Sequence, residues 1–287
     1  VITPKKIDPY FLYCYLTTPE FVKYLTQIAE THTSAYPSFK PEVIENARIH
    51  FPSNLQEQRK ISIFLRNFED KIECNIRIAK ILDDLCNLIF KMHFSMNENR
   101  PDLKIDRLKN HIKFIKGRKP GKMRYNKQEG DLPVILINSI DTGNFLYSNP
   151  KNQILCNEKD VLMVLDGASS GRVEKGYEGI IGSTLAKLLV VSNSITKEFL
   201  YLYLKEKYNQ INYNVTGSAI PHADKRYILS LKILIPDNET LESFQKIIEP
   251  YFEYRRILRK ENYFLNELIN NIKTNLISGR LKTKKVL

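Results

Sequence analysis

Two long stretches of the chain carry apolar residues at helical spacing, with polar residues between them. The first follows Pro52 and the second follows Pro236, and in each the apolar residues recur in alternating steps of three and four. This heptad pattern is typical of helices that pack against one another as a coiled coil. The seam positions are Ile61, Leu65, Phe68, Ile72, Ala79, Leu82, Cys86 and Ile89 in the first stretch, and Phe244, Ile248, Tyr251, Leu258, Leu265, Ile269, Ile272 and Leu276 in the second. Polar residues interrupt the seams at Asn75, Arg255 and Asn262.

The ends of both helices are also visible in the sequence. Ser53 and Gln56 have the spacing of a capping box before the first helix. Asp237 or Asn238 is the expected cap of the second helix, and Gly279 is its expected stop. A helix of about 40 residues is about 60 Å long, which is too long for the core of a small domain. We therefore expect the seams to face each other; the alternative is that each seam packs on its own globular domain.

The segment between the helices, residues 98–236, has a different character. It holds most of the 11 glycines and four short β-like runs, at 134–137, 161–165, 186–191 and 231–235. A helix-like stretch follows at 196–208. The segment is predicted to be a mixed α/β globular domain.

The chain also repeats itself. Residues 8–16 align with 196–204, residues 34–37 with 218–221, residues 47–52 with 231–236, and residues 80–85 with 263–268. These four blocks keep the same order with a nearly constant offset, which indicates a repeated unit of about 184 residues. The sequence thus contains one complete copy and part of another.

Composition and charge narrow the class of protein. With 43% hydrophobic residues, 14 Phe and 16 Tyr, the chain is not disordered, and no apolar run approaches the roughly 18 residues of a membrane span. The four cysteines (Cys14, Cys74, Cys86 and Cys156) form no C-x-x-C pair, which favours a reducing, cytoplasmic location. A net charge of +12 favours a polyanionic partner, nucleic acid before an anionic membrane surface. Val1 is followed by a sequence typical of the middle of a protein.

Catalytic motifs are weak. Residues 167–171 match G-x-S-x-G, but a serine hydrolase needs a helix directly after Ser169, and the glycine-broken segment 172–179 follows instead. Residues 117–123 fail as a phosphate loop because Met123 stands where Ser or Thr must bind Mg²⁺. No methyltransferase or nuclease motif is present, and the histidines His32, His50, His93, His111 and His222 lack metal-ligand spacing. We expect no catalytic site, metal or cofactor in this chain.

Three segments carry the residue types that bind a polyanion. Residues 116–127 hold six basic residues without an acid. Residues 167–172 form a loop of small residues that ends in Arg172. In residues 216–226, a turn is followed by three basic side chains. The alternatives are a solvated basic loop, a plain turn and a turn retained for packing. The predicted DNA contacts are Lys116, Arg118, Lys119, Lys122, Arg124, Ser170, Arg172, His222, Lys225 and Arg226.

Several segments resemble the specificity subunit of type I restriction-modification systems. Residues 51–61 resemble that family's strand, Pro and "LxEQxxI" entry to a helix, and residues 68–72 and 81–90 continue the pattern. Residues 217–221 followed by 231–236 look like the end of a target recognition domain, and residues 160–164 with Gly171 look like its central strand and turn. The second helix departs from the family, because it lacks the Glu-Gln pair.

The resemblance implies an α/β (α+β) target recognition domain with two long antiparallel helices. Its implied domains are residues 1–52 as the remnant of a first recognition domain, truncated at its N-terminus, 53–97 as a central spacer helix, 98–236 as a second recognition domain, and 237–287 as a second spacer helix with a basic tail. It also implies that the subunit reads part of a split target in double-stranded DNA and docks methyltransferase and restriction subunits. S-adenosylmethionine, Mg and ATP would then belong to those partners, and the exposed seams would permit self-association.

Two readings from other classes remain open. A non-catalytic assembly scaffold, with basic loops that serve solubility, predicts no DNA sequence preference. A serine hydrolase that uses Ser169 predicts labelling by a serine-reactive probe.

Overall fold

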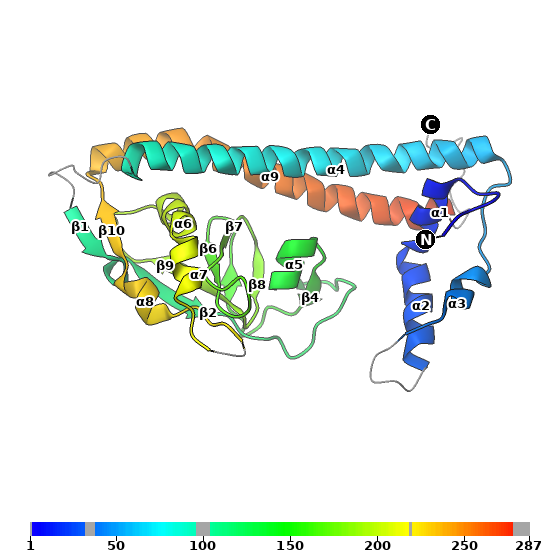
Figure 1. Ribbon diagram of the computed structural model, residues 1–287, viewed down its shortest axis with the longest axis horizontal. Coiled ribbons are helices and arrows are strands. Elements are labelled where there is room, and N and C mark those ends of the chain that lie inside the picture. The colour runs from blue at the N-terminus through cyan, green and yellow to red at the C-terminus, as the bar shows by residue number, and fades with distance from the viewer. Residues whose placement is uncertain (1, 32–37, 96–103, 218–219, 278–287) are drawn as a thin grey trace. The chain divides into compact units, whose positions relative to one another are not determined.

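The computed structural model describes residues 2–31, 38–95, 104–217 and 220–277 (Figure 1). Predictions for Gly279 and the basic tail, for residues 34–37 and 218–219, and for the side chain of Leu276 lie outside this description. The chain divides into two compact units. Unit 1 comprises Val1–Arg77 and Lys260–Leu287, and unit 2 comprises Ile78–Arg259. The two long helices, α4 (Leu55–Phe90) and α9 (Asn238–Ile277), contribute residues to both.

Unit 2 is built on three small sheets. One has the strand order β2-β9-β6-β7 and is antiparallel throughout. The second has the order β4-β3-β8-β5, with β3 and β8 parallel, and the third pairs β1 with β10. The strands are β1 (Lys104–Arg107), β2 (Ile112–Lys116), β3 (Leu132–Ile135), β4 (Leu146–Ser148), β5 (Leu155–Cys156), β6 (Val161–Val164), β7 (Val173–Lys175), β8 (Gly179–Ile181), β9 (Leu185–Val190) and β10 (Lys232–Ile235). The shorter helices of this unit are α5 (Ile137–Thr142), α6 (Lys197–Glu206), α7 (Tyr208–Tyr213) and α8 (Lys225–Ser230), with a π-helix η1 (Lys91–Ser95) and a 3-10 turn η2 (Leu108–Asn110).

Three of the four apolar runs that were predicted to be strands form strands, and the run 134–137 is the exception. Strands β6, β9 and β10 and helix α6 coincide with predicted elements to within about two residues. The run 134–137 is divided instead, because β3 ends at Ile135 and α5 starts at Ile137. The Ser139 hydroxyl donates to the carbonyl of Val134 at 3.2 Å, and Gly143 ends the helix in a left-handed conformation at φ 74°. Polar residues after Ile137 thus favour a capped helical turn over a longer strand.

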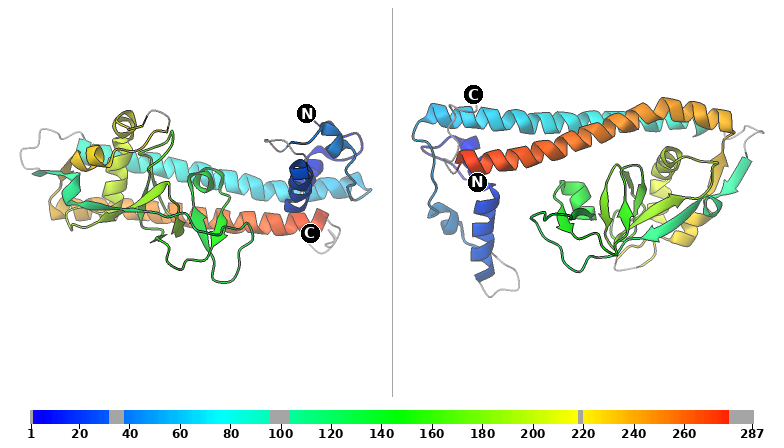
Figure 2. Two further views of the ribbon diagram at one scale, coloured as in Figure 1. Left: turned by 90° about the horizontal axis from the view of Figure 1, so that it is seen from below. Right: turned by 180° about the vertical axis from the view of Figure 1, so that it is seen from behind.

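Helix α6 lies between the antiparallel sheet and the long helices of unit 2 (Figures 1 and 2). Its apolar residues 199–204 are all buried. Phe199 packs edge-to-face on Phe90 of α4, with ring centroids 5.1 Å apart, while Phe94 packs on both Phe199 and Phe244 of α9 at 4.9 Å. This four-ring cluster joins α4, α6 and α9 in one hydrophobic core.

The long helices pack antiparallel in both units. In unit 2, Asp83 of α4 pairs with Arg255 of α9 at 2.7 Å. In unit 1, Glu69 of α4 pairs with Lys273 of α9 at 3.0 Å. Of the seam residues, Ile61, Leu65, Cys86, Phe244, Ile248, Leu258 and Ile269 are buried, while Phe68, Ile72, Ala79, Leu82, Ile89, Tyr251, Leu265 and Ile272 are half-buried. Self-association through these seams would require the helices to exchange partners.

The polar interruptions of the seams contact each other in unit 1. Asn75 is fully buried, and its amide donates to Asn262 and to Glu261, each at 2.8 Å. Its side-chain oxygen accepts from Lys71 at 3.0 Å. A satisfied buried amide of this kind fixes the register of a helix pair, because sliding one helix would leave it unpaired.

Unit 1 adds three short helices to the ends of α4 and α9: α1 (Pro9–Leu16), α2 (Pro19–Thr31) and α3 (Pro41–Glu45). Phe11 and Cys14 of α1 form a small core with Ile61 and Leu65 of α4. Helix α1 is the repeat counterpart of α6. Asp8 caps α1 by accepting from the backbone N–H of Phe11 at 3.0 Å, as Thr196 caps α6 by accepting from that of Phe199 at 3.1 Å.

The start of α4 differs from the prediction. The capping box of Ser53 and Gln56 does not form, because α4 begins at Leu55 and the Asn54 side chain accepts from the backbone N–H of Gln56 at 2.8 Å. At α9, Asp237 is the cap, accepting from the backbone N–H of Thr240 at 2.7 Å.

The predicted fold class is confirmed: a mixed α/β domain, two long antiparallel helices and an internal repeat. None of the described helices is long and apolar enough to cross a membrane.

Candidate nucleic-acid interface

The three predicted polyanion-binding segments meet in unit 2, at the ends of strands β2 and β6. The backbone N–H of Gly167 donates to the carbonyl of Pro221 at 2.9 Å, which ties the second segment to the third. The Asp166 carboxylate lies 2.7 Å from Nδ1 of His222, in the third segment, and 4.0 Å from Nζ of Lys116, in the first. Asp166 thereby links the first segment to the other two. Figures 1 and 2 show these segments on the side of unit 2 away from the long helices. We call residues 116–127, 166–172, 213–217 and 220–226 the three-loop face.

The first segment leaves β2 through a tight contact. The backbone N–H of Gly117 donates to Leu185 at 2.9 Å, and that of Arg118 donates to Ile181 at 3.0 Å. Beyond this anchor, Arg118, Lys119 and Lys122 are exposed, and none has an ion-pair partner among the described residues. These three cations are available to a ligand.

Arg124 lies at the other end of this loop and is engaged. Its backbone forms a bridge with Tyr147, and its guanidinium pairs with the buried Asp131 at 3.5 Å. Tyr147 itself is buried beneath the loop. Arg124 therefore has a role in holding the loop, in addition to the contact with DNA predicted for it.

Gly117 and Gly121 provide a matched test of the loop anchor. A Cβ at Gly117 would lie 2.3 Å from the carbonyl oxygen of Gly182, whereas a Cβ at Gly121 meets nothing within 4 Å. We expect Gly117→Ala to lower the midpoint of thermal unfolding and to weaken DNA binding, because backbone must shift to admit the methyl group. Gly121→Ala should leave both unchanged in calorimetry and in a binding titration. Equal behaviour of the two variants would contradict this anchor.

Ser170 is a correction to the predicted set of DNA contacts. Its side chain is 0% exposed, and its hydroxyl lies 2.6 Å from the carbonyl oxygen of Gly167, 3.0 Å from that of Pro221 and 3.2 Å from that of Leu165. A hydroxyl enclosed by backbone carbonyls is not available to DNA. Ser170 instead holds the Gly167–Gly171 turn against the third segment.

Arg172 ends this turn between two carboxylates. It pairs with Asp141 at 2.7 Å and with Glu174 at 3.2 Å. Burial alone would lower the pKa of Arg172, but the hydrogen bond with Asp141 and the charge of Glu174 raise it above the ordinary value. Arg172 is thus a fixed charge at the edge of the face, and a DNA phosphate would have to compete with these carboxylates.

The third segment presents Lys225 and Arg226 from the first turn of α8. Asp224 caps this helix by accepting from the backbone N–H of Arg226 at 2.8 Å. Lys225 and Arg226 are exposed, and the Lys225 ammonium lies 5.8 Å from the ring centroid of Phe114 in β2. The third basic side chain, His222, is also exposed.

Two aromatic residues were missing from the predicted contacts. Tyr125 is 86% exposed in the basic loop, and Tyr213 is 90% exposed at the end of α7. Helix α7 belongs to the face because Asn212 donates to the carbonyl of Ser170 at 2.9 Å. Exposed tyrosine side chains on a surface that binds DNA suit contact with sugars and base edges. Tyr125 was visible within its basic run, whereas Tyr213 had no signal in the sequence.

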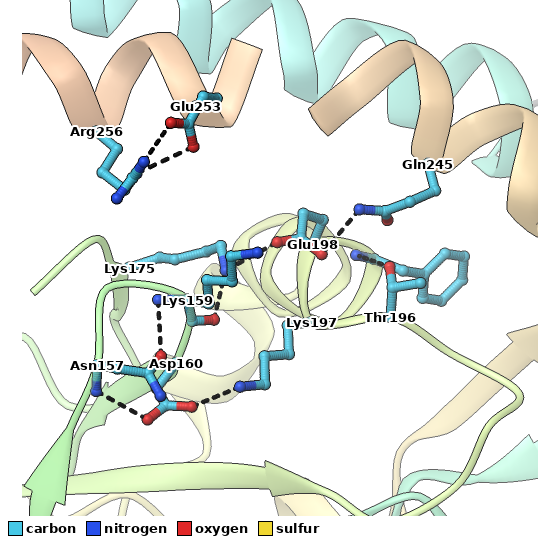
Figure 3. Close-up of polar contacts among 11 residues, drawn as sticks. Asn157, Lys159, Asp160, Lys175, Thr196, Lys197, Glu198, Gln245, Glu253 and Arg256 are labelled. Atoms are coloured by element: carbon cyan, nitrogen blue, oxygen red, sulfur yellow. Dashed lines mark hydrogen bonds and ion pairs between the residues drawn. The ribbon is translucent and has the colours of Figure 1, made fainter. Parts of the chain in front are cut away.

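A second set of charges in unit 2 lies among the segment before β6, strand β7 and helices α6 and α9. These charges are paired with one another, and Figure 3 shows the contacts around Asp160 and Glu198. Lys197 forms an ion pair with Asp160 at 2.6 Å, and the buried Lys175 forms one with Glu198 at 2.9 Å. Arg256 of α9 pairs with Glu158 at 2.6 Å. Burial lowers the pKa of Lys175. This network holds the sheet to α9, whereas the three-loop face keeps unpaired cations.

Chemistry at Ser169 has no support in the described part of the chain. The turn that contains Ser169 leads into strand β7 rather than into a helix, and no described histidine hydrogen bonds to Ser169. Within the same ranges, no group of three or more His, Cys, Asp or Glu side chains is placed to hold a metal ion.

The fold and the face together define a mixed α/β domain that presents a cationic loop surface and is carried on an antiparallel helix pair. Residues 1–83 and 102–275 match the family described as the type I restriction modification DNA specificity domain, and the chain belongs to that family.

Named relatives agree with this assignment. The chain is 30% identical over 169 residues to the type I restriction enzyme MjaVIII specificity subunit of Methanocaldococcus jannaschii. This alignment covers 58% of this chain and 40% of that protein. It is 23% identical over 304 residues to the MjaIX specificity subunit of the same organism, covering 96% of this chain and 70% of that protein. The crystal structure of the type I restriction-modification system S subunit from M. genitalium shares the fold, with a TM-score of 0.54, 17% identity, and coverage of 96% of this chain and 74% of that one.

Proposed function

We propose that this chain is a sequence-specific DNA recognition subunit and that its three-loop face contacts the duplex. The observation that carries the proposal is the convergence of three separate segments, which leaves Arg118, Lys119 and Lys122 unpaired on one surface. Unpaired cations attract phosphates, and loops on a rigid sheet are suited to reading base edges. Membership of the DNA specificity family supports this choice of polyanion.

The proposed role is non-catalytic. A subunit that reads part of a split target would act with methyltransferase and restriction subunits, which would supply S-adenosylmethionine, Mg and ATP, in the cytoplasm of its cell. The antiparallel helix pair would then act as the spacer between recognition domains. The buried Asn75 amide, which fixes the helix register, supports that use, because a spacer needs a defined length.

We propose that the methyltransferase subunit docks on the outer face of α4 in unit 2. Four exposed apolar residues recur in steps of four, three and four: Ile81, Leu85 and Leu88 of α4, and Met92 of η1, which directly continues α4. Isolated exposed hydrophobics are ordinary, but a heptad stripe on an already paired helix is the pattern of a further helix contact.

Leu88→Asp tests this docking surface. The Leu88 side chain is 53% exposed, so we expect its replacement to leave the unfolding temperature nearly unchanged and to weaken co-purification with the methyltransferase subunit by tenfold or more. Lys80→Asp, at an exposed position outside the stripe, is the control. Co-purification of Leu88→Asp at the level of the control would place the docking surface elsewhere.

Selection from randomised duplexes tests DNA recognition itself. The chain, alone and with its methyltransferase subunit, is incubated with random double-stranded DNA, washed at moderate salt, and the retained DNA is sequenced. Enrichment of a short motif, single or split by a fixed gap, is the expected result. Binding without any enriched motif would favour an assembly scaffold and contradict the proposal.

A further inference from the structure

An acidic residue lies at the centre of the three-loop face. Asp166 follows the buried Leu165, two residues beyond the end of β6, and its backbone bridges to His222. One oxygen of its carboxylate lies 2.7 Å from His222 Nδ1, and the other lies 4.0 Å from Lys116 Nζ. The carboxylate therefore contacts a residue from each of the two flanking segments.

The ring of His222 is oriented by a hydrogen bond on one edge and has Gly217 near another. Asp166 holds Nδ1, and the Cδ2 edge faces Gly217, where a Cβ would come within 3.0 Å of Cδ2 and crowd the ring. About half of the side chain, 51%, is exposed, and no described residue hydrogen bonds to Nε2. The structure thus fixes the ring and leaves one polar atom free on the face.

We propose that His222 contacts a base edge and that Asp166 is the positioning residue that sets which hydrogen bond it offers. This inference rests on the proposed DNA recognition and assigns a specificity determinant within it. A carboxylate only accepts hydrogen bonds, so the proton between the two groups is carried by Nδ1 of His222. When the ring carries that one proton, Nε2 is an acceptor. The amino groups of adenine and cytosine are the donors exposed in the major groove. His222 therefore suits a position that offers such an amino group.

The position of Asp166 at the centre of a basic surface has opposite effects on affinity and on specificity. A carboxylate near DNA repels phosphates and lowers affinity for every sequence alike. By orienting His222, the Asp166 carboxylate increases the preference of the face for particular base pairs. Asp166 thus reduces general affinity while raising discrimination.

The test compares motifs selected by four proteins: the unmodified chain, His222→Ala, Asp166→Asn and Lys225→Ala. We expect His222→Ala to reduce the preference at one base-pair position by roughly tenfold. Asp166→Asn should alter the preference at that same position, because an asparagine amide can donate to Nδ1 and move the ring proton to Nε2. Lys225→Ala, at an exposed cation on the same face, should weaken binding to all sequences and leave the motif unchanged.

His222→Gln guards against a folding defect, because glutamine restores an acceptor and should recover part of the lost preference. Uniform weakening by His222→Ala, with a salt slope shallower by about one, would make His222 a phosphate contact and overturn the inference. A change by Asp166→Asn at another position, or at none, would overturn the role of Asp166. Absence of any motif with the unmodified chain would instead overturn the proposed function, and this inference with it.

Discussion

Replacement of Arg118, Lys119 and Lys122 together by alanine should weaken DNA binding by roughly 500-fold at 0.1 M salt. Each neutralised phosphate contributes about −0.9 to the slope of log K against log salt, which corresponds to about eightfold per contact at that concentration. The three side chains are exposed and without ion-pair partners in the described structure, so each is free to make one such contact. A salt titration by fluorescence anisotropy should show a slope shallower by about 2.7.

The matched control removes the same charge elsewhere. Lys23, Lys60 and Lys80 are exposed lysines on helices outside the three-loop face, and their triple replacement by alanine also lowers the net charge by three. We expect this control to lose far less affinity and to keep its salt slope. Equal losses in both triple variants would mean that net charge, rather than the face, attracts DNA.

Phe244→Ala should produce the largest loss of stability among single substitutions in unit 2. Phe244 is 0% exposed and packs against Phe90, Phe94 and Phe199, with ring centroids 4.9 to 6.3 Å apart. Truncating such a residue removes its burial and leaves a cavity, which costs about 3–5 kcal/mol. Urea unfolding followed by tyrosine fluorescence and circular dichroism should show the transition of unit 2 at lower urea.

Ile257→Ala serves as the control on the same helix. Ile257 is 49% exposed, so its replacement should change the free energy of unfolding by less than about 0.5 kcal/mol. A Phe244→Ala protein that unfolds like this control would show that the four-ring cluster does not hold α6 to the helix pair.

The long helices could be predicted because their signal is periodic and local. The steps of three and four from Ile61 to Ile89 exist in the sequence whatever surrounds them. The pairing of Asn75 with Asn262 was not predictable, since it depends on which residues of the partner helix lie opposite. The start of α4 was misassigned because Ser53 and Asn54 are both good caps, and only the path of the chain decides between them.

The candidate site divides in the same way. The cations of residues 116–127 stand out by composition, and the structure leaves Arg118 exposed. Burial is a property of the tertiary fold, so the sequence could not show that Ser170 lies beneath the turn or that Arg172 lies between two carboxylates. The convergence of the three segments rests on the pairing of β2, β9 and β6, which spans more than 70 residues of chain.

Photocrosslinking from exposed tyrosine positions tests the central claim most directly. p-Benzoylphenylalanine replaces, one at a time, Tyr125 or Tyr213 on the three-loop face and Tyr13 or Tyr254 on helices α1 and α9, all four at exposed positions. Each protein is irradiated with random duplex DNA at the same occupancy. Crosslinks from positions 125 and 213, with few from 13 and 254, are the predicted result. Crosslinks mainly from 13 or 254, or none from 125 and 213 in a protein that binds DNA, would contradict the assignment of DNA recognition to this face.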